Sequence, residues 1–206
     1  MTSIFIVFQL IVLIFSAIIH EISHGAMANR LGDPTAKSMG RLSLNPLKHL
    51  EFFGSFLVPV MLWVLTKGSF VFGWAKPVPI NPYNIQDQKR GLAKVALAGP
   101  ASNLIMAIVF GMILRFLPQT NPQLILFGTF LSIIVQVNIL LAVFNLIPVP
   151  PLDGSKIVFA FLPAKYYQWE QKMEQNKFIV LAIVLIFAPY ILWPVISGIY
   201  RLIIGV

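Results

Sequence analysis

Residues 4–28 read IFIVFQLIVLIFSAIIHEISHGAMA, and this stretch contains no Lys or Arg before Arg30. A helix needs about 20 apolar residues to cross the hydrocarbon core of a bilayer, so the stretch is long enough to span a membrane. No basic residue precedes it, and no small-x-small cleavage pattern follows it. We therefore expect a transmembrane helix here rather than a removable signal peptide.

The composition of the whole chain is typical of a membrane protein. Its 206 residues are 58% hydrophobic and 11% charged, whereas soluble domains are about a quarter charged. This excludes an ordinary soluble globule and a disordered chain. The length suits a single domain covering residues 1–206. Because the chain has no Cys, any metal would be bound by His, Asp or Glu, and disulfides and thiol nucleophiles are excluded.

Further apolar runs follow the first. They cover about residues 52–65, 92–117, 124–147 and 178–204. The run at 52–65 is shorter than a spanning helix requires. Glycines and prolines between residues 68 and 79 predict irregular backbone that lines a cavity. Pro189 and Pro194 predict a kinked or broken helix in the last run.

The basic residues predict how these runs are oriented. They cluster after the first run and before the runs at 92–117 and 178–204, whereas the link at 118–123 is uncharged. Cytoplasmic loops carry an excess of Lys and Arg, so we assign the net charge of +8 to such loops rather than to nucleic-acid binding. Residues 52–65 then form a re-entrant hairpin on the cytoplasmic side, with a fifth span there as the alternative. We predict an all-α polytopic membrane protein with about four to six transmembrane helices; the charges favour four, with both termini outside.

The pattern His20-Glu21-Ile22-Ser23-His24 lies within the first run. At 3.6 residues per turn the two His lie about 40° apart on one helix face, a spacing that lets two imidazoles bind one zinc ion. Glu21 lies beside His20, where its carboxylate can accept a proton from a water without being a ligand. An ionisable group inside a span costs roughly 2.5–3.5 kcal/mol on insertion scales, so two packed His without a role are the weaker interpretation.

A catalytic zinc site usually has three protein ligands and one open position for water. Asp153 and His49 are the candidates for the third ligand. Asp153 follows a proline-rich stretch and precedes Gly154, which predicts an irregular segment with a tight turn. The charge pattern places Asp153 and the end of the first run at the same, cytoplasmic side. Asp153 is therefore favoured, and His49 is interpreted as an interfacial residue.

With these residues the chain resembles the site-2 protease family of intramembrane zinc metalloproteases, in its compact branch without a PDZ or CBS domain. Residues 20–24 (HEISH) match the first motif of that family, and residues 99–103 (GPASN) match its Gly-x-x-x-Asn motif. Residues 150–154 (PPLDG) match the Asp-Gly end of its third motif. Val149 stands where the full Asn-Pro-x-x-Asp-Gly form has Asn, and Asn145 resembles the more distant Asn of some members.

The resemblance implies particular roles for these residues. His20, His24 and Asp153 would bind one Zn²⁺ per chain, and Glu21 would act as general base. Asn103 or Asn145 would donate a hydrogen bond to the substrate or its developing oxyanion. The predicted function is hydrolysis of peptide bonds in or near transmembrane segments, as in regulated intramembrane proteolysis.

The expected partners are the lipid bilayer and single-span membrane-protein substrates, for which the resemblance implies type II regulators already trimmed by another protease. Nucleic acid is not expected. We expect a multi-pass protein of the cell membrane whose active site faces the cytoplasmic side.

The alternative function is a metal-ion or proton transporter, since intramembrane His, Glu and Asp also mark ion pathways. The runs at 92–117 and 178–204 contain neither acidic residues nor His, which indicates a single cluster rather than a path. A catalytically inactive scaffold is a third class, and the intact Glu21 argues against it.

Overall fold

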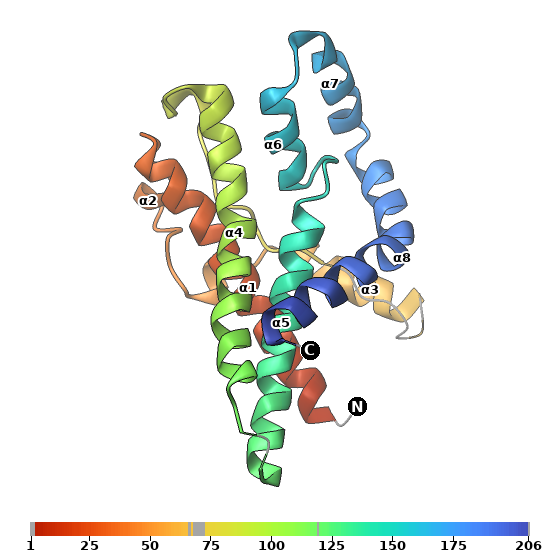
Figure 1. The fold of residues 1–206 in the computed structure, drawn as a ribbon. Helices are drawn as coiled ribbons and strands as arrows, with labels where there is room; N and C mark the ends of the chain where they lie inside the picture. The colour runs from red at the N-terminus through yellow and green to blue at the C-terminus, as the bar shows by residue number, and fades with distance from the viewer. Residues whose placement is uncertain (1–2, 66, 68–72, 119, 206) are drawn as a thin grey trace.

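The computed structural model of the chain describes residues 3–65, 67, 73–118 and 120–205 (Figure 1). These residues form helices joined by turns and loops, with no β-strand among them. The prediction of an all-α protein is therefore confirmed.

Long helices make up the body of the molecule. They are α1 (Ser3–Arg30), α4 (Gln88–Arg115), α5 (Pro122–Asn145) and α8 (Lys177–Ile204). The first three are each long and apolar enough to cross a membrane. Helix α8 is bent by 63° between Phe187 and Tyr190, around Pro189 as predicted, and is a fourth candidate span if its halves count together. The chain is thus a polytopic membrane protein with three to four candidate spans, and the range of four to six stays a prediction.

The ends of these helices follow from local sequence. The Asn121 side chain accepts a hydrogen bond from the Leu124 N–H at 2.9 Å, and Pro122 is the first helical residue of α5. This is the expected start of a helix, because proline lacks the N–H that would be left unpaired there. Helix α8 ends at Ile204 and is followed by Gly205, whose positive φ of 80° favours glycine.

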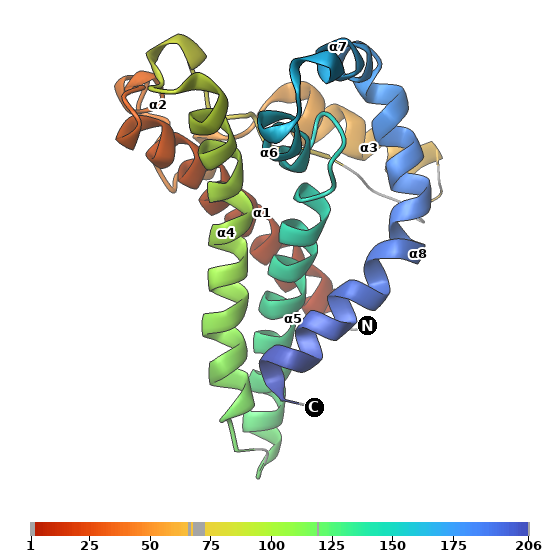
Figure 2. The same ribbon diagram turned by 45° about the horizontal axis from the view of Figure 1, so that its top comes forward.

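Helices α1, α4 and α5 lie side by side, and the second half of α8 crosses α5 (Figures 1 and 2). Their common core contains Ala107 of α4, Val135 and Ile139 of α5, and Leu192 and Ile196 of α8. Figure 2 shows the first half of α8 standing away from α4. The bend in α8 is what returns the chain to the bundle.

The segment predicted as a re-entrant hairpin starts with a π-helical turn, Phe53–Leu57, which continues into the short helix α3 (Val58–Leu65). Residues 68–72 of its return lie outside the described residues. The Trp74 N–H donates to the Gly54 carbonyl at 3.0 Å, so the two ends of the segment meet, as a hairpin requires. Its insertion into the membrane and the predicted cavity at 68–79 stay predictions.

Shorter helices gather at the end of the bundle that is uppermost in Figures 1 and 2. They are α2 (Thr35–Ser38), α6 (Asp153–Phe161) and α7 (Tyr167–Gln175). Short 3₁₀ turns cover Pro46–Lys48, Pro82–Asn84 and Ala164–Tyr166. Sequence analysis placed Asp153 in an irregular turn, and this was wrong. Asp153 is the first residue of α6, and the irregular segment covers 146–152 instead, because the prolines after α5 end before residue 152.

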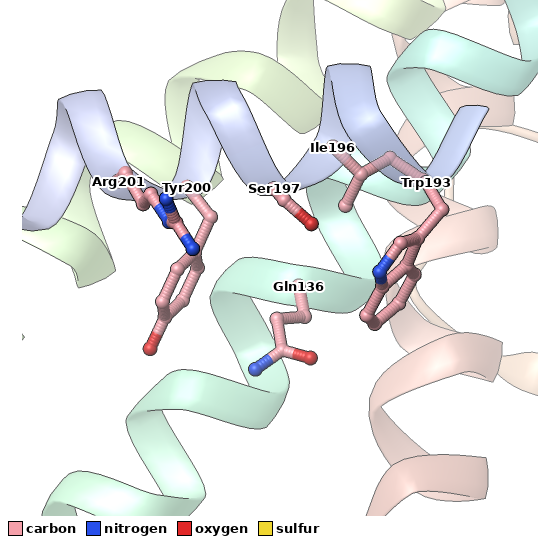
Figure 3. Close-up of a pocket in the computed structure, with 6 residues that line it drawn as sticks. All are labelled: Gln136, Trp193, Ile196, Ser197, Tyr200 and Arg201. Atoms are coloured by element: carbon pink, nitrogen blue, oxygen red, sulfur yellow. The ribbon is translucent and has the colours of Figure 1, made fainter. Parts of the chain in front are cut away.

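A cavity of about 200 Å³ lies where the second half of α8 crosses α5 (Figure 3). Gln136 of α5 lies between the side chains of Trp193 and Tyr200 of α8. The Gln136 amide donates to the Ser132 hydroxyl at 2.9 Å, and that hydroxyl lies 2.7 Å from the Tyr200 hydroxyl. These bonds satisfy polar groups inside two apolar helices.

Candidate metal centre

Three potential metal ligands converge between α1 and α6. His20, His24 and Asp153 each place one ligand atom within 4.8 Å of the others, and all three side chains are buried. The Asp153 Oδ2 atom lies 3.1 Å from Nε2 of His20 and 3.1 Å from Nε2 of His24. The structure thus brings together the three residues that sequence analysis selected as ligands.

The helical spacing of α1 sets the relative position of the two imidazoles. Their ring centroids lie 4.6 Å apart, and the ring planes are almost perpendicular, at 88°. Because both Nε2 atoms approach the same oxygen of Asp153, two nitrogen lone pairs and one carboxylate oxygen face a common point. This is the arrangement that one bound cation requires.

Hydrogen bonds at the other ring nitrogens orient both imidazoles. Nδ1 of His24 donates to the Val95 carbonyl at 2.7 Å, and Nδ1 of His20 lies 2.6 Å from Oδ1 of Asn103. Since a carbonyl can only accept, the proton of neutral His24 is on Nδ1 and its Nε2 is free to bind a metal. Metal-binding His residues usually have such a partner, which fixes both tautomer and ring orientation.

Asn103 belongs to a buried polar network behind His20. Its amide donates to the Ser16 carbonyl at 3.3 Å and to Oδ1 of Asn138 at 2.9 Å, and Asn138 donates to the Ser16 hydroxyl at 3.0 Å. Asn103 and Asn138 are 0% exposed. Both hydrogens of the Asn103 amide are thus used inside the protein, and its contact with the site is to His20. The predicted hydrogen bond from Asn103 to a substrate has no free donor in this arrangement.

Sequence analysis did not select Asn138, Ser16 or the Val95 carbonyl. Two of them could have been found from the sequence. Asn138 is an amide within an apolar run, where a polar side chain needs a partner. Ser16 lies one helical turn before His20. The Val95 carbonyl could not have been found, because every residue has a backbone carbonyl and the sequence does not show which one accepts the hydrogen bond.

Two glycines let the helices that carry the ligands approach closely. A Cβ on Gly99 of α4 would lie 2.5 Å from the His24 ring and 2.6 Å from the His20 ring. A Cβ on Gly154 would lie 2.2 Å from the Leu146 carbonyl oxygen. Real Cβ atoms do not approach so closely, so glycine is required at both positions for the imidazoles and Asp153 to lie where they do.

Glu21 lies next to the cluster but is not one of its ligands. Its Oε2 atom accepts a hydrogen bond from the Val78 N–H at 2.8 Å, and the residue is half-buried. Its role as the group that takes a proton from a water beside the metal stays a prediction. Val78 was not selected from the sequence.

The two remaining residues selected from the sequence are His49 and Asn145. His49 was interpreted as interfacial, but it is 1% exposed and its Nε2 donates to the Ser43 carbonyl at 2.7 Å. It is therefore an interior residue of the loop after α2. The Asn145 amide donates to the Leu141 carbonyl of its own helix at 2.9 Å, and its catalytic role stays a prediction.

A sequence model of Peptidase family M50 matches residues 119–188, which include Asp153. The chain is 36% identical over 198 residues to "Putative zinc metalloprotease YwhC" of Bacillus subtilis, covering 93% of this chain and 86% of that protein. The chain belongs to peptidase family M50. It is also 28% identical over 174 residues to "Putative zinc metalloprotease Rip2" of Mycolicibacterium smegmatis, covering 84% of this chain and 64% of that protein. No solved structure matches the chain.

As a member of family M50, the site-2 proteases, the chain is a metalloprotease. The names of these relatives imply zinc, and the donor set of the M50 site fits zinc on its own chemistry. Two imidazole nitrogens and one carboxylate oxygen are typical zinc ligands, and three protein ligands leave one position open for water or substrate. Both imidazoles already have the outer hydrogen bonds that such ligands use.

In this M50 site we expect the change Gly99→Ala to weaken zinc binding by about 10–100-fold. This is the typical loss when a residue that orients the metal ligands is changed. The added methyl group would push the two imidazoles away from Asp153. Competition with a chelating fluorescent indicator measures the zinc affinity. Gly198→Ala in α8 is a matched control, because a Cβ there would contact nothing within 4 Å. Wild-type zinc affinity in Gly99→Ala would contradict the proposed ligand arrangement.

Proposed function

We propose that this M50 peptidase hydrolyses peptide bonds in or near the transmembrane segments of other membrane proteins, with one zinc ion per chain. The observation that carries the proposal is the convergence of His20, His24 and Asp153 beside Glu21, where both His and Glu21 belong to α1, a helix long enough to cross a membrane. His20 and His24 lie in the second half of a candidate span. A site there can reach peptide bonds that soluble proteases cannot.

The chemistry that zinc supplies when bound is acidification of a water and polarisation of a carbonyl. His20, His24 and Asp153 hold the ion, and Asn103 and Val95 keep the two imidazoles in place. Glu21 accepts the proton of the attacking water at a carboxylate oxygen and later donates it to the leaving amine. Asn145 is a candidate donor to the developing oxyanion. Its amide group has two hydrogens, and the hydrogen bond to the Leu141 carbonyl of its own helix uses one of them.

A substrate helix must unwind locally before its backbone can be cleaved, because its peptide groups are otherwise paired within the helix. The hairpin between residues 52 and 79 is the candidate to pair with the unwound segment by β-strand addition. Single-span membrane proteins, including type II regulators trimmed by an earlier cleavage, are the proposed substrates, within regulated intramembrane proteolysis.

We place the protein in the cell membrane, with the site towards the cytoplasm. The support is the positive-inside rule: Arg30 is in the last turn of α1, after His24, and Lys156 is in α6, three residues after Asp153. Lys89 is in the first turn of α4. Cysteines introduced singly at Lys48 and Gln86 should then resist a membrane-impermeant thiol reagent added outside intact cells. Labelling at Gln86 alone would instead indicate a true crossing between these positions.

A metal-ion or proton transporter would need ionisable residues along a path across the membrane. Helices α4, α5 and α8 contain no Asp, Glu or His. The only group of three or more such side chains found among the described residues is the one at the metal centre. The arrangement therefore favours the peptidase.

Cleavage by the purified protein in detergent tests this function. The probe is a tagged fusion protein with one apolar transmembrane segment that carries a central Gly-Pro pair. We expect cleavage in or beside that segment, located by mass spectrometry, which stops with 1,10-phenanthroline and returns when Zn²⁺ is added. The non-chelating isomer 1,7-phenanthroline is the control and should leave the rate unchanged. Cleavage that survives metal removal, or that falls only in the soluble tags, would contradict the proposal.

A further inference from the structure

We propose that residues 76–81, here called the strap, position Glu21 for catalysis. The Val78 N–H holds one oxygen of the Glu21 carboxylate, and two buried charged residues, Arg41 and Asp33, fix the strap on either side of Val78. The inference rests on the proposed function in that it takes Glu21 as the general base. It adds positioning residues for that base.

The contact between the strap and Glu21 is a single backbone hydrogen bond. The Val78 N–H donates to Oε2 of Glu21 at 2.8 Å, and within the described part of the chain this is the one hydrogen bond found for that carboxylate. A carboxylate has two oxygens that accept. With Oε2 held by the strap, Oε1 is left to accept the proton of the attacking water.

Arg41 fixes the strap before Val78. Its Nη2 donates to the Lys76 carbonyl at 2.9 Å and to the Pro77 carbonyl at 3.3 Å. The Lys76 N–H also donates to the His49 carbonyl at 2.8 Å. Arg41 is 8% exposed, and a buried guanidinium is tolerated only where hydrogen bonds replace water.

Asp33 fixes the strap after Val78. Its Oδ2 accepts from the Asn81 N–H at 2.7 Å, and its Oδ1 accepts from the Asn84 amide at 3.0 Å and the Thr35 N–H at 3.1 Å. Burial alone would raise the pKa of the Asp33 carboxyl, but hydrogen bonds from Thr35, Asn84 and Asn81 outweigh it and lower that pKa. The carboxylate is therefore ionised at neutral pH and keeps these donors in place.

Packing against α1 holds the strap in register with Glu21. The Val78 side chain is 5% exposed and lies over Gly25, one residue after the ligand His24. A Cβ on Gly25 would come within 2.8 Å of Cγ1 of Val78 and 2.7 Å of Cδ2 of Leu42. Glycine at this position thus lets the strap lie directly on the helix that carries Glu21.

The sequence around Val78 makes this contact measurable. Pro77 and Pro79 have no N–H, so Val78 contributes the single exchangeable backbone amide of residues 77–79. In hydrogen exchange read by mass spectrometry, this amide should exchange at least about tenfold faster in Glu21→Ala than in wild type, because its acceptor is gone. Unchanged exchange would show that Glu21 does not hold the strap, and would overturn the proposal without any activity measurement.

The role in positioning is tested with Asp33 variants on the fusion-protein probe. We expect Asp33→Ala to lower kcat by about 10²-fold, the usual cost of a misplacement of about 1 Å, with KM and zinc content near wild type. Asp33→Asn keeps an acceptor oxygen for the Asn81 N–H and should recover much of that loss. Asp87→Ala is the matched control, because Asp87 is an exposed carboxylate that caps α4 and does not touch the strap.

The outcomes separate this inference from the proposed function. Faster exchange at Val78 in Asp33→Ala with unchanged kcat would overturn the positioning role. If Asp33→Ala does not fold, Asp33→Asn and Arg41→Lys give the same two readouts. If wild type cleaves nothing, the proposed function fails, whereas exchange at Val78 in Glu21→Ala still decides whether the strap holds Glu21.

Discussion

Glu21→Gln is expected to abolish nearly all cleavage while leaving the zinc content unchanged. Glutamine has the size and shape of glutamate but does not accept a proton at neutral pH. Removal of a general base typically costs 10²–10⁴-fold in rate. Zinc should stay bound because His20, His24 and Asp153 are untouched, and Glu21 is not one of the grouped ligands.

Single-turnover cleavage of the fusion protein and elemental analysis of the same sample measure both quantities. Glu174→Gln is a matched control, since Glu174 is an exposed residue of α7 that pairs with Lys177 at 3.0 Å. Loss of zinc together with cleavage in Glu21→Gln would make Glu21 a ligand and favour a transporter. Cleavage at the wild-type rate would leave the proposed mechanism without its base.

Asp153→Ala is expected to remove zinc from the protein. The change leaves only two imidazoles, which bind zinc weakly compared with a site of three ligands. The affinity should therefore fall by more than the roughly 10–100-fold typical of an outer-shell change. Elemental analysis after dialysis against a weak chelator should find almost no zinc, and cleavage should be lost with it.

His49→Gln is the informative comparison for Asp153→Ala, because His49 is the other His of the chain and was the alternative third ligand. It lies in the loop after α2 with its Nε2 bonded to the Ser43 carbonyl, so His49→Gln should keep its zinc. A full complement of zinc in Asp153→Ala, with loss in His49→Gln, would assign the third ligand to His49.

Much of the fold could be predicted because an apolar run long enough to span a membrane has few structures open to it other than a transmembrane helix. The runs at 4–28, 92–117, 124–147 and 178–204 became α1, α4, α5 and α8, and the bend in α8 lies at Pro189. The short helix α6 was not predicted. Asp153 was expected in a turn because Gly154 follows it, whereas close packing on the Leu146 carbonyl explains that glycine.

The metal ligands could be selected because ionisable side chains are rare in this chain and costly inside a span. The two His share a helix, so their spacing alone predicts a common face. Asn103 was selected by resemblance, and only the structure shows that it contacts His20. The partner of Glu21 is the backbone N–H of Val78, which no side-chain pattern could reveal.

X-ray absorption at the zinc edge of the purified wild-type protein tests the central claim most directly. The account predicts one zinc ion with nitrogen and oxygen ligands at about 2.0–2.2 Å and outer-shell scattering from two imidazoles, those of His20 and His24. The same spectrum should be found for Glu21→Gln. Outer-shell scattering from three imidazoles, or from fewer than two, would contradict a site formed by His20, His24 and Asp153.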